Sequence, residues 1–203
     1  LTFDVQTQIA SRMGYAERAG ASGVERFMKH YYIVAKDVGD LTRIFCAAIE
    51  AENMSKPIIR LPRLRRSRDL MGFQVDRDRL TVADENQFAD DPVALIRLFY
   101  VAHNEGLDIH PHALRLVTQN LKRIDKTLRA DPEANRMFVE MATSIDVPEV
   151  VLTRMNEAGV FGKFLRDFGR VVGQTQHDMY HVYTVDEHTI QAIGLLAKIE
   201  RGE

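Results

Sequence analysis

The stretch "DPVALIRLFYVAHNEGLDIHPHALRLV", residues 91–117, decides the fold class of this chain. Pro92 and Pro111 each stand directly ahead of an apolar run with helical periodicity, and Gly106 separates the two runs. Proline is favoured in the first turn of a helix, because the backbone donor that it lacks has no helical partner there. Glycine readily adopts the left-handed conformation that ends many helices. The stretch therefore predicts two consecutive helices, over about 92–105 and 111–128.

The same pattern of prolines before apolar runs and glycines after them continues towards the C-terminus. Pro132 and Pro148 precede two further periodic runs, and Gly159 follows the second of them. Asp91 and Asp131 are N-cap candidates, since a carboxylate can accept a free backbone N–H at a helix start. We expect helices over about 132–143 and 148–158, joined by short loops in a compact array.

A longer helix is expected upstream, over about 23–52. Ser22 and Glu25 form an S-x-x-E capping box at its start. Apolar residues then recur at helical spacing and predict one buried stripe: Phe27, Tyr31, Val34, Val38, Leu41 and Phe45. Cys46 lies one position from this stripe, so we expect it to be a structural thiol rather than a nucleophile.

The segment "MGFQVDRDRLTVAD", residues 71–84, alternates apolar and polar side chains around a polar turn. Alternation with period two is typical of a strand that is half buried. A small β-hairpin is predicted at about 70–83. The fold class expected is therefore mainly α: a multi-helix array with one small β-hairpin.

Composition excludes several classes of protein. The chain has 203 residues, 45% hydrophobic and 28% charged, with a net charge of -2, as in an ordinary globular protein. No apolar run approaches the length that crosses a bilayer, so we expect no membrane association and a cytoplasmic location. The single cysteine excludes a disulfide framework and a cysteine-based zinc site within the chain.

Leu1 and Glu203 look like trimmed ends, and we expect the chain to be a piece of a longer protein.

An arginine-rich stretch, "MSKPIIRLPRLRRSRD" at residues 54–69, interrupts the helical pattern. Clustered arginines can bind the phosphates of a nucleic acid or nucleotide. No aromatic side chain interleaves them to stack on bases, so a solvated basic loop is the alternative that we favour.

Histidines are the other candidates for chemistry. For His103, His110 and His112 we expect capping or surface roles, because no cluster of carboxylates or cysteines surrounds them. Thr184 and Glu187 form a second capping box, which places His188 in the first turn of the last helix.

His188 shares a helix face with Ala192, Leu195 and Ile199. From spacing alone, this face predicts a hydrogen-bonded core histidine rather than a metal ligand.

Four extended segments resemble one family in the expected order: "ERFMKHYYIVAKDVGDLTRIFCAAIEAE" (25–52), the opening stretch (91–117), "LTRMNEAGVFGKFLRDFGRVV" (152–172) and "DMYHVYTVDEHTIQAIGLLAKIERG" (178–202). They are similar to the bifunctional uridylyltransferase/uridylyl-removing enzymes of PII signalling proteins. That resemblance implies a nucleotidyltransferase domain, a helical domain, an HD-type hydrolase domain and two ligand-sensing domains.

By the same resemblance, residues 1–172 would be the helical domain that follows the nucleotidyltransferase domain, and residues 173–203 the start of the HD-type domain. The family transfers UMP from UTP to a tyrosine of PII and removes it by hydrolysis, with glutamine as the effector. Its active sites use Mg²⁺ (or Mn²⁺), but the transferase carboxylates and the His-Asp dyad are absent from this chain. We therefore expect no catalytic residue and no metal held by the chain alone. His188 falls on the position of the first metal-binding histidine of the HD domain.

Candidate nucleotide-facing residues lie on two helices. Asp91 also matches an acidic residue in the neck helix of tRNA nucleotidyltransferases and poly(A) polymerases. Alanine stands at position 94, where that group has its base-reading arginine. Three cations of the long helix, Arg26, Lys29 and Lys36, could meet UTP phosphates from a face that the core does not need; ion pairing on a solvated face is the alternative.

Two hypotheses follow from the sequence. The first is a non-catalytic helical connector between two opposing active sites. The second is a stand-alone helical module that binds nucleic acid or an acidic protein through residues 56–68. Since the net charge is close to zero, we do not expect nucleic acid as a partner.

Overall fold

The computed structural model describes residues 2–18, 20–53, 70–174 and 184–203. These residues form a mainly helical fold with one small sheet, so the predicted fold class is confirmed. The elements are α1 (Phe3–Arg12), α2 (Gly23–Asn53), β1 (Phe73–Asp76), β2 (Arg79–Val82), α3 (Gln87–Asp90), α4 (Ala94–Glu105), β3 (Asp108–Ile109), α5 (Pro111–Asn120), the 3-10 helix η1 (Leu121–Arg123), α6 (Lys126–Ala130), α7 (Pro132–Ala142), α8 (Pro148–Glu157), α9 (Val160–Phe164), α10 (Arg166–Val171) and α11 (Val185–Arg201).

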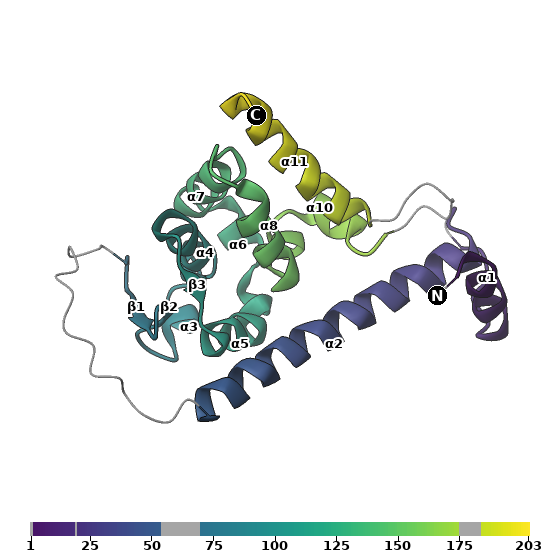
Figure 1. The fold of residues 1–203 in the computed structure, drawn as a ribbon, viewed down its shortest axis with the longest axis horizontal. Helices are drawn as coiled ribbons and strands as arrows, with labels where there is room; N and C mark the ends of the chain where they lie inside the picture. Colours follow the sequence, from purple (N-terminus) through teal and green to yellow (C-terminus); the bar gives the residue numbers. More distant parts are fainter. Residues whose placement is uncertain (1, 19, 54–69, 175–183) are drawn as a thin grey trace.

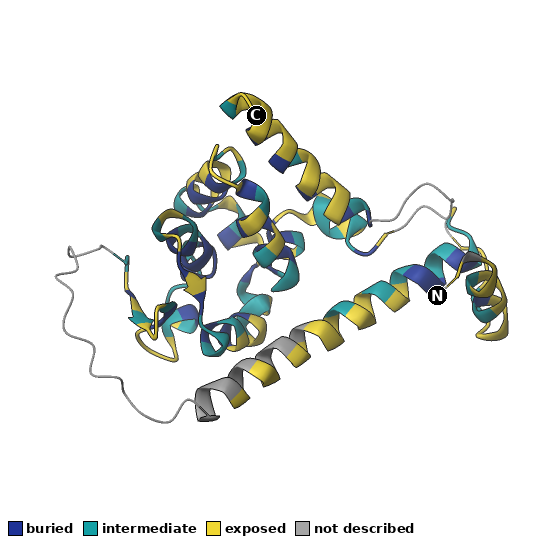
Figure 2. Ribbon diagram, viewed as in Figure 1, coloured by how far each residue is buried: buried dark blue, intermediate teal, exposed yellow. Residues whose placement is uncertain are grey.

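The central lobe, which we define as β1 to α10 (Figure 1), has a hydrophobic core to which helix α4 contributes most of its residues. Seven of the twelve residues of α4 are buried, among them Leu95, Leu98 and Phe99. A helix that is apolar on nearly every side can lie only in a core. Helices α7 and α8 pack directly on α4, and Figure 2 shows buried residues concentrated in these helices.

The helix boundaries agree with those predicted from the prolines and glycines, with two exceptions. The helices expected at 132–143 and 148–158 are confirmed as α7 and α8. Helix α4 begins at Ala94 rather than Pro92, because the carboxylate of Asp91 accepts the N–H of Val93 and holds Pro92 in the preceding turn. Gly106 and Gly159 adopt positive φ angles of 62° and 74°, as the helix ends require.

The single helix expected at 111–128 is divided in the structure. Helix α5 ends at Asn120, η1 follows, and α6 starts at Lys126. Asp125 causes the division, because its Oδ1 accepts the N–H groups of Thr127 and Leu128 at 2.8 and 3.0 Å and so caps a new helix. Helices α1, α3, α9 and α10 were not predicted.

The predicted hairpin is confirmed as β1 and β2, which pair antiparallel with Phe73 opposite Val82. The structure adds a short third strand: β3 pairs parallel to β2, with Leu80 opposite Ile109. The sheet order is β1-β2-β3. One face of the sheet contributes Phe73, Leu80 and Val82 to the core of the lobe.

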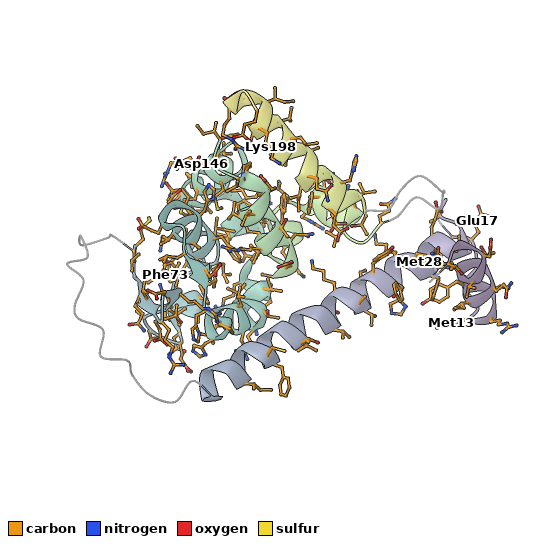
Figure 3. All side chains as sticks on the ribbon, in the orientation of Figure 1. Met13, Glu17, Met28, Phe73, Asp146 and Lys198 are labelled. Carbon is orange, nitrogen blue, oxygen red and sulfur yellow. The ribbon has the colours of Figure 1, made fainter. Side chains whose placement is uncertain are left out.

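Helix α2 extends along one side of the central lobe (Figure 1). Its first turns pack on α1, where Ala10, Val24, Phe27 and Met28 form a second small core; Met28 lies in the contact between the two helices (Figure 3). The rest of the predicted buried stripe is solvent-exposed. Tyr31, Val34, Val38, Leu41 and Phe45 expose between 42% and 67% of their surface.

The prediction of one buried stripe was therefore wrong beyond Phe27. Helix α2 meets the lobe with a different face, which carries Lys29 and Lys36. Cys46 is also exposed, so the expectation of a buried structural thiol was wrong as well. The arginine-rich stretch lies outside the described residues.

Candidate functional site

A groove of about 680 Å³ lies between α2, α8 and the start of α11. Helix α2 contributes Tyr32, Ile33 and Lys36, and α8 contributes Thr153, Asn156 and Glu157. The third wall comes from Val172 and Gly173 together with the first turns of α11. It is larger than the pocket of about 440 Å³ between α1 and the start of α2.

The start of α11 is fixed by the predicted capping box. Thr184 accepts the backbone N–H of Glu187, and the Glu187 carboxylate accepts the N–H of Thr184 at 3.4 Å. Two backbone donors that a helix start leaves free are satisfied in this way. The helix therefore begins where the sequence placed it.

Asp186 is the most buried carboxylate of the groove, with 3% of its surface exposed. Its Oδ2 accepts a hydrogen bond from Asn156 Nδ2 at 2.7 Å, and its Oδ1 accepts one from the Gly173 N–H at 3.0 Å. Sequence reasoning missed this residue. The only available signal was an acidic residue in the first turn of a capped helix, which by itself indicates no partner.

The three cations singled out on α2 all donate to backbone carbonyls. Lys36 Nζ bonds to the carbonyl oxygen of Asn156, Lys29 Nζ to that of Arg170 at 2.8 Å, and an Arg26 guanidinium nitrogen to that of Ala16 at 2.6 Å. Lys36 lines the groove, and Lys29 and Lys36 join α2 to the central lobe. Contact of these cations with UTP phosphates stays a prediction.

Asp91 lies outside the groove, at the start of α4. Arg97 bonds to Asp91 Oδ2 at 2.6 Å and to Glu133 Oε1 at 3.0 Å. Burial lowers the pKa of Arg97, but the hydrogen bonds and charges of Asp91 and Glu133 outweigh burial and leave the pKa raised. Asp91 thus has a structural role in joining α4 to α7, and its contact with nucleotide stays a prediction.

Two family models match this chain in order. Residues 1–46 match the model described as GlnD PII-uridylyltransferase, and residues 73–164 match the third domain of uridylyltransferase GlnD. The chain belongs to the GlnD uridylyltransferase family.

Curated relatives in the GlnD family match along the full length of the chain. A bifunctional uridylyltransferase/uridylyl-removing enzyme of Azospirillum brasilense is 60% identical over 206 residues, and one of Rhodospirillum rubrum is 54% identical over 203 residues. In both cases the match covers 100% of this chain and 22% of the relative. The chain thus spans about a fifth of the length of these relatives. No solved structure matches it.

The two matched segments meet at the groove. Lys36 lies within the PII-uridylyltransferase match and Asn156 within the third-domain match, whereas α11 lies beyond both. The groove is therefore the place where two recognised parts of a GlnD chain and a third element come together.

His188, the metal-ligand candidate, is exposed on α11. Leu195 and Ile199 on the same face are 59% and 69% exposed, so the expectation of a core histidine was wrong. Within the ranges that the structure describes, no three histidine, cysteine or acidic side chains gather closely enough to hold a metal ion. These residues therefore do not by themselves fit a site for Mg²⁺ or Mn²⁺; His177 and His181 lie outside the described residues.

Of the histidines for which capping or surface roles were expected, His110 is a cap and His103 is partly buried. His110 Nδ1 accepts the N–H of His112 at 3.1 Å and caps α5. His103 Nε2 lies 3.0 Å from Ser144 Oγ, and burial lowers the pKa of His103.

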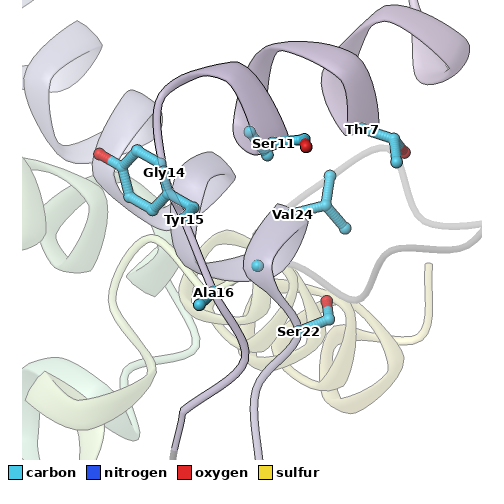
Figure 4. A pocket seen from close by; sticks show the side chains of 9 residues that line it. Thr7, Ser11, Gly14, Tyr15, Ala16, Ser22 and Val24 are labelled. Carbon is cyan, nitrogen blue, oxygen red and sulfur yellow. The ribbon is translucent and has the colours of Figure 1, made fainter.

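The second pocket, of about 440 Å³, lies between α1 and the start of α2 (Figure 4). Small and hydroxyl-bearing side chains line it, including Thr7, Ser11, Tyr15 and Ser22, with no charged group. Such a lining offers no acid, base or metal ligand at neutral pH. No helix in the described part of the chain combines the length and apolarity that crossing a membrane requires.

Proposed function

We propose that this chain is the helical connector of a bifunctional GlnD enzyme. The enzyme would transfer UMP from UTP to a tyrosine of the PII protein and would remove that UMP by hydrolysis, with glutamine as effector. The identity of 54–60% to two relatives bearing both activities in their names supports the proposal. A longer protein that contains a segment this similar should carry the same two activities.

The contact between the two matched segments carries the connector role. Most of helix α2 lies in the segment that matches PII-uridylyltransferase, and this part is hydrogen-bonded to the third-domain segment through Lys36 and Asn156. A second link joins Lys29 to the carbonyl of Arg170. Helices joined by direct hydrogen bonds can transmit a shift of one to the other, provided that the contact has two arrangements.

In this proposal residues 1–172 belong to the connector and residues 173–203 open the uridylyl-removing domain. His188 would be one ligand of Mg²⁺ or Mn²⁺, completed by side chains that other parts of the enzyme supply. A divalent ion would activate water for hydrolysis. The described residues contribute the placement of α11 and hold no complete ligand set.

The proposal is tested by measuring both reactions on two proteins. One is the 203-residue chain, and the other is the longer gene product that we propose contains it. We expect the longer protein to label PII from radioactive UTP and to release UMP from labelled PII, and the chain alone to do neither. Turnover by the chain alone, or absence of both reactions from the longer protein, would overturn the proposal.

A substitution in the longer protein tests His188. We expect His188→Ala to abolish release of UMP and to leave transfer of UMP intact. Thr189→Ala is the matched control, since Thr189 is the exposed neighbour on α11 and its hydroxyl donates to the Val185 carbonyl of the same helix at 2.7 Å. Equal loss in both variants would argue against a ligand role for His188.

A further inference from the structure

We propose that Asp186 is a positioning residue for the uridylyl-removing reaction. Its buried carboxylate fixes the first turn of α11, and with it His188, to Asn156 of α8, and Asn156 extends the link to Lys36 of α2. This inference rests on the proposed function and deepens it, because it names the contact that joins α2 and α8 of the connector to α11 of the uridylyl-removing domain.

The chemistry of the contact requires a carboxylate at position 186. An ionised carboxylate only accepts hydrogen bonds, and each oxygen of Asp186 faces a donor: Asn156 Nδ2 at one and the Gly173 N–H at the other. Hydrogen bonds to a charged group are stronger than those between neutral groups. The position in the first turn of α11 also favours negative charge.

Asn156 serves two helices with different atoms. Its side-chain amide donates to Asp186 of α11, and its backbone carbonyl accepts from Lys36 of α2. Asn156 is itself buried, with 6% of its surface exposed, so water has little access to its side-chain amide. One residue of α8 is therefore hydrogen-bonded to both α2 and α11.

The backbone around this contact is closely packed. A Cβ at Gly173, whose φ is 67°, would lie 3.2 Å from Ile33 Cγ1 and 3.5 Å from the Lys29 carbonyl oxygen of α2. The N–H that Gly173 gives to Asp186 thus comes from a turn that is itself in contact with α2. A displacement of Asp186 has to move the turn, and through the turn the helix.

An amide–carboxylate exchange provides the decisive variants. Asp186→Asn leaves one NH₂ group facing a donor, either the NH₂ group of Asn156 or the N–H of Gly173, and Asn156→Asp places two carboxylates together. The double variant Asp186→Asn/Asn156→Asp restores one donor and one acceptor with the charge unchanged. Glu200→Gln is the matched control, since it removes one negative charge from an exposed position of the same helix.

The first measurement is amide hydrogen exchange of the 203-residue chain. We expect exchange in α11 to be about 10- to 100-fold faster in each single variant, as loss of a hydrogen bond to a charged group implies. The double variant should return towards the wild-type rate, and Glu200→Gln should equal the wild type. Wild-type protection of α11 in both single variants would overturn the inference without involving any enzymatic activity.

The second measurement compares both reactions in the longer protein. We expect Asp186→Asn to lower kcat for UMP release by about tenfold or more, as misplacement of a reacting group implies. Transfer of UMP should change less, and the double variant should recover release. Loss of both reactions in equal proportion, or no recovery in the double variant, would show a structural role only.

The outcome separates this inference from the proposed function. A longer protein without transfer and release activity would refute the function itself. A longer protein that requires His188 for release but tolerates Asp186→Asn would keep the function and refute the positioning role.

Discussion

Gly194 of α11 lies directly against the side chain of Glu149 on α8. A methyl group added at Gly194 would come within 2.8 Å of Glu149 Oε2 and 3.0 Å of Glu149 Cβ. Within the described part of the chain, Glu149 Oε2 is also a buried side-chain oxygen without a hydrogen-bond partner. The absence of a side chain at position 194 therefore allows α11 to approach α8 closely.

Substitution of Gly194 by alanine should weaken this contact. Alanine favours a helix by roughly 1 kcal/mol over glycine, but the overlap with Glu149 costs about 1–3 kcal/mol. We expect a net loss of unfolding free energy in urea. The double variant Gly194→Ala/Glu149→Ala should lose less than the sum of the two single variants, since truncation of Glu149 frees the space. Strict additivity would contradict the contact.

Gly169→Ala should be more damaging, because its obstacle is backbone. A Cβ at Gly169 would overlap the carbonyl oxygen of Gly162, and the neighbouring rings of Phe161 and Phe168 stack with their centroids 3.8 Å apart. We expect a loss of about 1–3 kcal/mol in the free energy of unfolding.

Gly39→Ala is the matched control for Gly169→Ala. Gly39 lies within α2, and no atom stands within 4 Å of the position that its Cβ would occupy. We expect this variant to gain about 0.5–1 kcal/mol from helix propensity alone. A gain at position 169 as well would show that α9 and α10 are not in close contact.

Arg97→Met should destabilise the α4–α7 contact. It leaves Asp91 and Glu133 without the cation that both of them bind, and the Arg97 side chain is only 15% exposed. We expect a loss of about 1–3 kcal/mol, measured by urea unfolding at low ionic strength. Arg136→Met is the comparison, since Arg136 pairs with Glu140 on an exposed surface and should contribute much less. Equal effects would contradict the structural role of Asp91 and Arg97.

Stability should fall as the pH is lowered past the normal pKa of histidine. Burial lowers the pKa of His103 below 6.5 in the folded chain, so the unfolded chain binds the proton first. The stabilisation is complete above pH 6.5 and is lost between that value and the lower folded pKa. His103→Gln should reduce the fall in Tm between pH 7.5 and 5.5. Burial also lowers the pKa of His110, so a smaller pH dependence should remain.

The sequence predicted the elements whose signals are local. Helix α4 was recognisable from the periodic apolar run between Pro92 and Gly106, and α7 and α8 were recognisable from the prolines that open them. The capping box of α11 was equally predictable from the sequence, since its two partners are three residues apart. Hydrogen bonds and periodicity that involve only neighbouring residues can be predicted from the sequence of those residues.

Contacts between distant residues were not predictable in this way. The stripe from Tyr31 to Phe45 is apolar at helical spacing, but periodicity only identifies an apolar face and does not say what covers it. Asp186 and Asn156 are 30 residues apart, and neither has a sequence pattern that names the other. The candidate site could therefore be identified only from the structure, which shows how the helices pack against one another.

The pairing of Leu80 with Ile109 closes a loop of chain that contains the most buried helix, α4. Strands β2 and β3 are the two ends of this loop, and α3 and α4 lie between them. The sheet is consequently connected to both ends of α4, through β2 and α3 on one side and through β3 on the other. We therefore expect that neither the sheet nor α4 unfolds without the other. The β1–β2 hairpin and α4 should therefore unfold as one cooperative unit, so a destabilising substitution in the hairpin should also lower the stability of α4.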